Sequence, residues 1–234
     1  MTVAKQNLFA GFFCMFLLSI GQASSLKAAE TTDLTGRYFM IVWSYQGPDG
    51  DLVHAHTFAS FYLGDDLAKG VVRPETISWL PATAVVQPFG SEKGHNFSLT
   101  KTLQMACSAG RQIHSWGPYE IDATLFDSAI KRLALLYSGR VRYSMINALP
   151  RSMNCITAAG DLTGAPLDTG ILWGNAASAK VVEHFSPHIL GKAFALKDLI
   201  ARSRSDACPG QPAEISPQAA NTSIKQSIAA TLGH

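Results

Sequence analysis

The sequence contains one pronounced hydrophobic run, and that run is too short to span a bilayer. It covers residues 8–20 of the 234-residue chain, whereas a transmembrane helix needs about 20 apolar residues. Lys5 precedes the run, and the small residues Gly21 and Ala23 flank Gln22 after it, a pattern typical of a cleaved export signal. We therefore expect residues 1–23 to be a signal peptide, and the mature protein to be periplasmic or secreted with no membrane span.

The sequence also lacks a marked excess of charge of one sign. Its 19 Lys and Arg residues stand against 17 Asp and Glu residues, which gives a formal net charge of +2. The expected signal peptide takes away one of those cations, Lys5, and no acid. Binding to nucleic acid depends on a basic surface, so we expect no nucleic-acid partner.

Cysteine is scarce: the chain has four, and three of them, Cys107, Cys155 and Cys208, follow the expected signal peptide. Thiols tend to pair in an oxidising compartment, and an odd number leaves at least one free or paired between chains. If Cys155 is catalytic, Cys107 and Cys208 are the expected pair. The alternative is three buried, unpaired thiols.

The order of the predicted elements indicates the fold class. Strands are expected over residues 37–45 and 52–63, joined as a hairpin by a Gly-Pro-Asp-Gly turn at 47–50. Helices are expected over 98–108, 123–137 and 154–159, begun by the caps Ser98, Asp122 and Asn154. Strands followed by helices interleaved with strands indicate an α+β protein with a mainly antiparallel sheet.

Composition divides the mature chain into three parts. Residues 24–35 are small and polar and are expected to be flexible, and residues 36–205 are expected to form a single α+β domain. Residues 206–234 are rich in Pro, Gln, Ala and Ser and are expected to be a mobile tail. The sequence leaves the oligomeric state open.

The strand expected over residues 52–63 carries two histidines, His54 and His56, two positions apart. Side chains alternate along a strand, so both imidazoles should lie on one face with Phe58, Ser60 and Tyr62. The alternate residues are almost all apolar and should face the core. The histidine face is therefore a candidate surface for chemistry, with a solvated polar face as the alternative.

Cys155 follows Asn154 at the start of a predicted helix. Backbone N–H groups and the positive end of the helix dipole lower a thiol pKa at that position. With a histidine as base, the thiolate could attack an amide or ester carbonyl. We expect His56 to be that base, because it lies deeper in its strand than His54; the alternative for Cys155 is a packed structural thiol.

A base needs a partner on its second ring nitrogen. The candidates are Ser78, His114 and Glu120, of which His114 is counted with Cys155 and His56 as catalytic. Residues expected to bind substrate are Asn154 and Tyr62, near the proposed pair, and the turn-flanking aromatics Trp79, Trp116 and Tyr119. Ordinary core packing is the alternative for the aromatic residues.

Two further hypotheses use the histidines differently. His-x-His on a strand is a metal-ligand spacing, and His95, His114 or Glu120 could supply a third ligand to a metal-dependent hydrolase. No compact motif links those residues, so we expect no metal or other cofactor. The other hypothesis is a non-enzymatic exported binding module whose histidine face recognises a ligand.

Two motifs resemble the circularly permuted branch of the NlpC/P60 papain-like superfamily, the lecithin:retinol acyltransferase type. A histidine strand there runs on to a Tyr-x-Gly-Asp corner, as His56 here leads to the sequence YLGD at 62–65, and the nucleophile often lies in an Asn-Cys pair like Asn154-Cys155. The stretch from His56 to Tyr62 is two residues longer than in that family, which keeps the same face of a strand.

The resemblance implies a permuted papain-like fold and thiol-dependent hydrolysis or acyl transfer. The substrate would be a small molecule, a cell-wall peptide or a lipid. The stretches HAHTF, ISWLPAT, WGPYEID and NCITAAGDL also resemble a group of exported bacterial proteins over residues 37–162. That second resemblance supports one domain and implies no activity.

Overall fold

The computed structural model describes residues 33–48, 54–87, 89–146, 149–167, 169–170 and 172–210. They belong to a compact unit that spans Thr32–His234. The expected signal peptide, most of the expected flexible segment and the tail from residue 211 lie outside the described residues. Among the helices that are described, none has the length and apolar character needed to cross a membrane.

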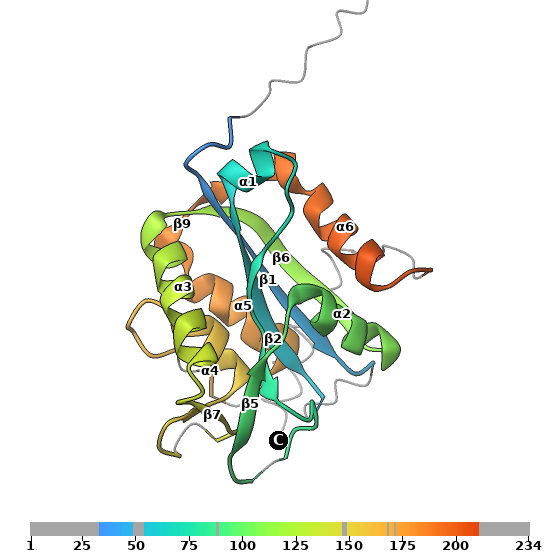
Figure 1. The fold of residues 1–234 in the computed structure, drawn as a ribbon, viewed down its shortest axis with the longest axis vertical. Helices are drawn as coiled ribbons and strands as arrows, with labels where there is room; N and C mark the ends of the chain where they lie inside the picture. Colours follow the sequence, from blue (N-terminus) through green and yellow to red (C-terminus); the bar gives the residue numbers. More distant parts are fainter. Residues whose placement is uncertain are drawn as a thin grey trace, which may run out of the picture. The chain divides into compact units, whose positions relative to one another are not determined.

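A five-stranded antiparallel sheet is the central element (Figure 1). Its strand order is β3-β2-β1-β6-β9. These strands are β1 (Tyr38–Gln46), β2 (His56–Leu63), β3 (Glu75–Ile77), β6 (Gln112–Ile121) and β9 (Ile189–Lys192). The predicted hairpin is confirmed, because β1 and β2 pair antiparallel from Tyr38 opposite Leu63 to Tyr45 opposite His56.

A second, smaller sheet has the order β4-β5-β7-β8. It consists of β4 (Trp79–Pro81), β5 (Glu92–Asn96), β7 (Arg142–Tyr143) and β8 (Ser152–Met153), and only β7 and β8 are parallel. The polar sequence of β5 predicts a loop, and that prediction is wrong because pairing with β4 and β7 decides its conformation. Gly94 of β5 lies against Trp79, where a Cβ would come within 2.0 Å of the indole ring.

Six α-helices and two 3₁₀ turns are described. They are α1 (Gly64–Ala68), α2 (Leu99–Ser108), α3 (Ala123–Tyr137), α4 (Cys155–Gly160), α5 (Gly174–His184), α6 (Asp198–Ala207), η1 (Ser186–His188) and η2 (Phe194–Leu196). The three predicted N-caps are confirmed. The side chains of Ser98, Asp122 and Asn154 accept hydrogen bonds from the N–H groups three residues ahead, at 3.3, 2.8 and 2.8 Å.

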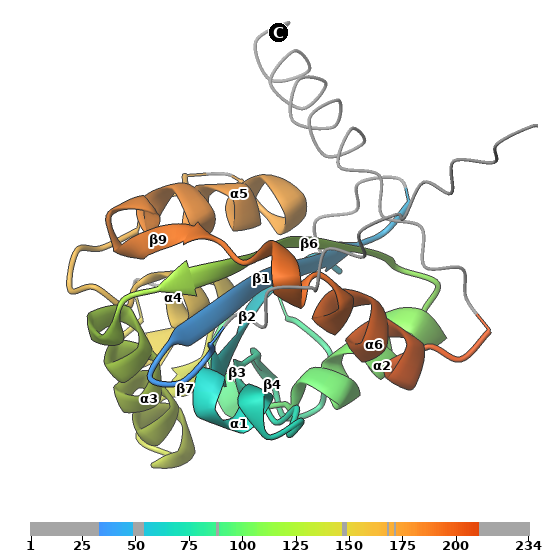
Figure 2. The same cartoon turned by 90° about the horizontal axis from the view of Figure 1, so that it is seen from above.

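The helices cover both faces of the large sheet and enclose two cores (Figure 2). The first core joins Met40, Val42, Ala59 and Phe61 of the sheet to α3, α4 and α5. The second core joins the alternate residues of the same strands to α2 and α6; those sheet residues are Phe39, Ile41, Trp43, Phe58 and Tyr62. Because both faces are covered, β1 is apolar on both. The α+β class with a mainly antiparallel sheet is thus confirmed.

Two local predictions differ from the structure. The sequence Gly117-Pro118 predicts the end of a strand, but β6 continues through it to Ile121. A β-bulge, where the register shifts between Met40 and Val42, accommodates one extra residue on β6, so that Gly117 and Pro118 lie opposite Ile41. On α3, helical spacing predicts an apolar stripe of Phe126, Ile130, Leu133 and Tyr137. Phe126 and Leu133 are buried, whereas Ile130 and Tyr137 are exposed, so the buried face is rotated from the predicted one.

A disulfide joins Cys107, near the end of α2, to Cys208, which follows α6, with a Cα–Cα distance of 5.9 Å. This is the expected pairing, and Cys155 is the free cysteine among the described residues. Because α6 runs to Ala207 and Cys208 is bonded, the folded part continues past the expected domain end at residue 205.

Candidate functional site

The proposed base His56 is buried in the second core. Its ring stacks on Phe58 and lies against Tyr45, with centroid distances of 5.2 Å in both cases. Its Nε2 atom lies 2.9 Å from the Ser78 hydroxyl oxygen. Burial lowers the pKa of His56 to about 3, so the imidazole is neutral at pH 7.

A chain of hydroxyl groups links His56 to the start of α2. Thr102 Oγ1 lies 2.7 Å from Ser78 Oγ and 2.9 Å from the Ser98 carbonyl oxygen. Each hydroxyl has one hydrogen to donate. If Thr102 donates to the Ser98 carbonyl and Ser78 donates to Thr102, Ser78 has no hydrogen left for His56. The Nε2–H of His56 then donates to the Ser78 oxygen. His56 Nδ1, which has no hydrogen-bond partner among the described residues, is then a bare lone pair. Ser78 was one of three expected partners of His56, and the structure brings those two together.

The proposed nucleophile Cys155 is the first residue of α4 and is buried in the first core. Burial raises the pKa of its thiol to about 11, although hydrogen bonds from the backbone N–H groups of Thr57, Ile156 and Cys155 act in the opposite direction. The sequence argument that a helix start lowers a cysteine pKa thus identified a real contribution, but desolvation outweighs it.

No described hydrogen bond joins His56 to Cys155, since His56 Nε2 bonds Ser78 and its Nδ1 has no partner among the described residues. Successive β2 side chains point to opposite faces: His56 bonds Ser78 in the second core, whereas Thr57 Oγ1 lies 3.0 Å from Ser178 Oγ of α5 beside the first core. Cys155 belongs to that first core. Catalysis by His56 and Cys155 stays a prediction. The described contacts of the two residues do not include one between them.

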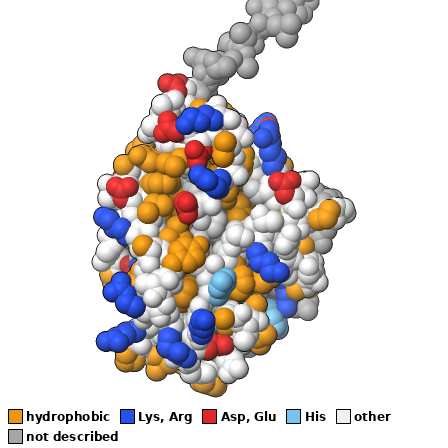
Figure 3. Space-filling model, viewed as in Figure 1, with side chains coloured by type: hydrophobic (Ala, Val, Ile, Leu, Met, Phe, Trp, Pro, Cys, Tyr) orange, Lys and Arg blue, Asp and Glu red, His pale blue; other side chains and the backbone are white. Residues whose placement is uncertain are grey.

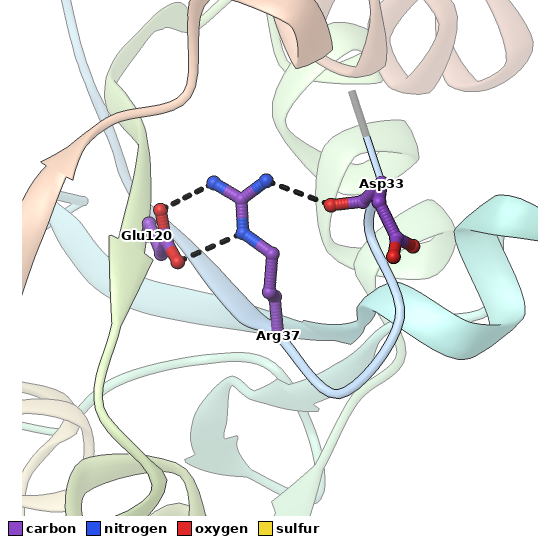
Figure 4. Close-up of polar contacts among 3 residues, drawn as sticks. All are labelled: Asp33, Arg37 and Glu120. Carbon is purple, nitrogen blue, oxygen red and sulfur yellow. Dashed lines mark hydrogen bonds and ion pairs between the residues drawn. The ribbon is translucent and has the colours of Figure 1, made fainter. Parts of the chain in front are cut away.

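Neither of the other two expected partners, Glu120 and His114, forms a described hydrogen bond with His56. Glu120 accepts hydrogen bonds from Arg37 Nε at 2.8 Å and Nη2 at 2.5 Å, and Arg37 Nη1 donates to the Asp33 carbonyl (Figure 4). These bonds hold the pKa of Glu120 below its usual value, with a smaller opposing effect from burial. His114 lies on β6 opposite Ser44, and the Ser44 side chain bonds Asn175 of α5, not the second core.

The five expected substrate-binding residues do not line one groove. Tyr62 is buried in the second core and Trp79 in the first. Trp116 and Tyr119 are half-buried and pack against the first core. Asn154 is buried and caps α4. The four aromatic residues among them therefore pack in or against the cores, which is the alternative to substrate binding.

The metal hypothesis receives no geometric support. Within the described part of the chain, no three His, Cys, Asp or Glu residues lie close enough to hold a metal ion together. Of the possible third ligands, His95 packs edge-on against Phe97 at 4.5 Å and Glu120 bonds Arg37.

A pocket of about 610 Å³ lies along α2 at one end of the large sheet, within the range of small-molecule sites. Helix α2 has two faces: Leu99, Leu103 and Ala106 enter the second core, and a second stripe at helical spacing lines the pocket. The lining residues are Tyr45, His54, Ala55, Leu80, Ala84, Val85, Val86, Lys101, Gln104, Met105, Ser108, Ala109 and Arg111.

The pocket wall combines apolar side chains with a few polar groups. Leu80 and Met105 supply apolar surface, and the charged side chains are Lys101 and Arg111. Burial raises the pKa of Tyr45 far above its usual value; the nearby Cys155 thiol adds to this effect and the Arg111 cation opposes it. The Tyr45 hydroxyl therefore lies near both Arg111 and Cys155.

Figure 3 shows hydrophobic side chains gathered on part of one face of the molecule. Lys and Arg side chains are spread over that face and mixed with acidic and hydrophobic ones. Exposed large hydrophobic residues occur at several places along the chain, among them Val85 of the pocket rim and Phe194 of η2.

Comparison with known proteins gives no relative from which to carry over a function: no protein-family model, no curated protein and no solved structure matches this chain. The fold and the pocket define the class, an α+β protein with helices on both faces of an antiparallel sheet and a partly apolar pocket at one end of it. Sequence reasoning found one pocket residue, His54, and missed the α2 stripe of Lys101, Gln104, Met105 and Ser108.

Proposed function

We propose that this protein is a non-enzymatic binding protein that holds a small molecule in the pocket along α2. The observation that carries the proposal is the pocket itself, which combines about 610 Å³ of space with apolar walls and a small number of polar groups. Ligand sites have this composition, since apolar walls supply affinity and a few polar groups fix orientation. His54 contributes to this wall, although its neighbour on the expected histidine face, His56, lies in the core.

We also propose that the protein works outside the cytosol. Two observations support this: residues 1–23 have the pattern of an export signal, and the Cys107–Cys208 disulfide suits an oxidising compartment. The disulfide also fixes the end of α2 to α6, next to the pocket residues Ser108 and Ala109. An oxidising environment would therefore preserve the pocket wall.

The neutral fluorophore Nile red tests the binding proposal without depending on charge. Its fluorescence should increase and shift to the blue with saturable 1:1 stoichiometry. Ser108→Trp places an indole on the pocket face of α2 and should abolish the signal, whereas Thr100→Trp, on an exposed α2 position that does not line the pocket, should retain it. No enhancement, or equal enhancement in the two variants, would exclude a pocket-bound ligand.

A thiol-dependent hydrolase or acyltransferase of the permuted papain-like type is the second candidate. Three observations favour it. Cys155 begins α4, its sulfur accepts hydrogen bonds from backbone N–H groups, and its charge acts on the pKa of the pocket residue Tyr45. A fluorogenic ester assay comparing the wild type with Cys155→Ser tests it, since thiol-dependent turnover must disappear in the variant.

A further inference from the structure

We infer that the pocket takes an amphipathic organic anion, a carboxylate on a hydrocarbon body, with the carboxylate at Arg111 and the body lying along α2. This inference rests on the proposed binding function and specifies its ligand class. It depends on the charges of the pocket wall, the position of Arg111 and the distribution of apolar side chains.

Among the described residues that line the pocket, the charged side chains are of one sign. Lys101 and Arg111 are cationic, and none of the described lining residues is Asp or Glu. Within the described residues, neither cation forms an ion pair, since the pairs present join Arg37 to Glu120, Arg73 to Asp66, Lys180 to Glu183 and His188 to Asp122. A half-buried guanidinium without a counter-charge is costly, and a bound anion would offset that cost.

Arg111 is the better of the two cations for holding the anion. It is half-buried, whereas Lys101 is exposed, and its planar guanidinium can donate two parallel hydrogen bonds to one carboxylate. Tyr45 lines the same pocket, so its hydroxyl is a second donor on the pocket wall. Lys101 and Arg111 both line the pocket, Lys101 from the first turn of α2 and Arg111 from the segment after it, where its backbone N–H bonds the Ala106 carbonyl.

Apolar side chains make up another part of the pocket wall. Met105 supplies apolar surface from α2, and Leu80 and Val86 supply it from β4 and the segment after it. Val85, on the same segment, leaves 64% of its surface exposed. A hydrocarbon body would cover these side chains, and burial of apolar area is the main source of affinity for such a ligand.

Calorimetric titration of the intact, oxidised protein with decanoate, decan-1-ol and decylamine tests the inference, because the three probes share a chain and differ in charge. Decanoate should bind at least about tenfold more tightly than decanol, as expected for a charge-assisted hydrogen bond, and decylamine should bind most weakly. Arg111→Met should remove the decanoate advantage and leave decanol unchanged, and Arg111→Lys should restore part of it.

Two matched controls locate the effect. Arg202→Met removes one positive charge from an exposed position of α6 outside the pocket and should change decanoate affinity by less than about twofold. Lys101→Met should have a smaller effect than Arg111→Met. Equal binding of decanoate and decanol would overturn the anion inference while leaving the binding function intact. A larger loss of decanoate affinity in Lys101→Met than in Arg111→Met would overturn the placement of the carboxylate at Arg111. If no probe binds, both fail.

Discussion

His56 and Cys155 come from neighbouring elements, β2 and α4, but their side chains are packed in different cores. The ring of His56 lies among Tyr45, Phe58 and Ser78 beside α2, whereas Cys155 is buried in the core that α3, α4 and α5 form with the other face of the sheet. Strand alternation sends the side chains of His56 and Thr57 to opposite faces, whereas Cys155 accepts a hydrogen bond from the backbone N–H of Thr57.

Cys155 is expected to react slowly with thiol reagents. With a pKa of about 11, about one thiol in ten thousand is ionised at pH 7, and the side chain is 1% exposed. Iodoacetamide should therefore modify Cys155 at least about a hundredfold more slowly in the native protein than in protein denatured in urea, as measured by intact mass. Rapid native alkylation at pH 7 would instead favour the hydrolase candidate.

Stability is expected to fall as the pH decreases from about 6.5 toward 3, because His56 is held neutral in the folded state. Burial lowers its folded-state pKa to about 3, while the unfolded chain takes up a proton near pH 6.5. The unfolded state thus binds more protons in this window, and the unfolding free energy should drop by up to about 1.4 kcal/mol per pH unit from this residue.

Urea unfolding at several pH values between 5 and 7.5 measures this slope. Carboxylates titrate mostly below that range. Burial and the charge of Arg204 also lower the pKa of His114, so His114 contributes to the slope in the same direction. His56→Gln should flatten the slope, whereas His95→Gln, at an exposed position of β5, should leave it unchanged. Identical slopes in the wild type and His56→Gln would refute the assignment.

The Arg37–Glu120 ion pair is expected to make a modest contribution to stability. Its side chains are 30% and 23% exposed, so solvent screens the attraction between the charges. The bidentate geometry makes the contribution to stability larger than that of an ordinary surface ion pair. Glu120→Gln should cost about 1 kcal/mol of unfolding free energy at low salt and less at high salt. Glu183→Gln, which breaks the more exposed pair with Lys180, should cost less than about 0.5 kcal/mol.

Gly94 is expected to tolerate no side chain. A Cβ there would lie 2.0 Å from the Trp79 ring, which is fully buried, so Gly94→Ala should destabilise the protein by about 1–3 kcal/mol through overpacking. Gly191→Ala in β9 is the matched control, because a Cβ at that position meets no atom within 4 Å. Chemical denaturation of both variants should separate them; equal stability would mean that β4 and β5 do not pack as described.

The Cys107–Cys208 disulfide is expected to support both stability and binding. It closes a sequence separation of 101 residues, for which chain entropy predicts about 4 to 5 kcal/mol as an upper value. The paired substitution Cys107→Ser and Cys208→Ser should lower the unfolding free energy and also weaken Nile red binding, since α2 is a pocket wall. A pocket that binds equally well without the disulfide would show that α2 is positioned independently of α6.

Local features of the fold could be predicted from the sequence because their causes are local. The β1–β2 hairpin follows from residue type and a turn, and the caps Ser98, Asp122 and Asn154 each act within three residues. The polar strand β5 and the passage of β6 through Gly117 could not be predicted, because pairing with other strands decides both.

The site was harder to predict than the fold for the same reason. Period-two alternation places His54 and His56 on one face, but it does not say that α2 covers that face and buries His56. The pocket is assembled from the ends of β1, β2, β4 and β6 with one stripe of α2. Each part, such as Lys101 or Met105, looks like an ordinary surface position in the sequence, and only the tertiary arrangement brings them together.

The most direct test of the central claim is a crystal structure of the protein with 10-bromodecan-1-ol, a neutral probe whose bromine marks its position by anomalous scattering. The account predicts one bromine peak inside the pocket, between α2 and the wall formed by Tyr45 and Leu80. A peak confined to another surface, or an empty pocket at saturating probe, would contradict the proposal that this protein binds its ligand along α2.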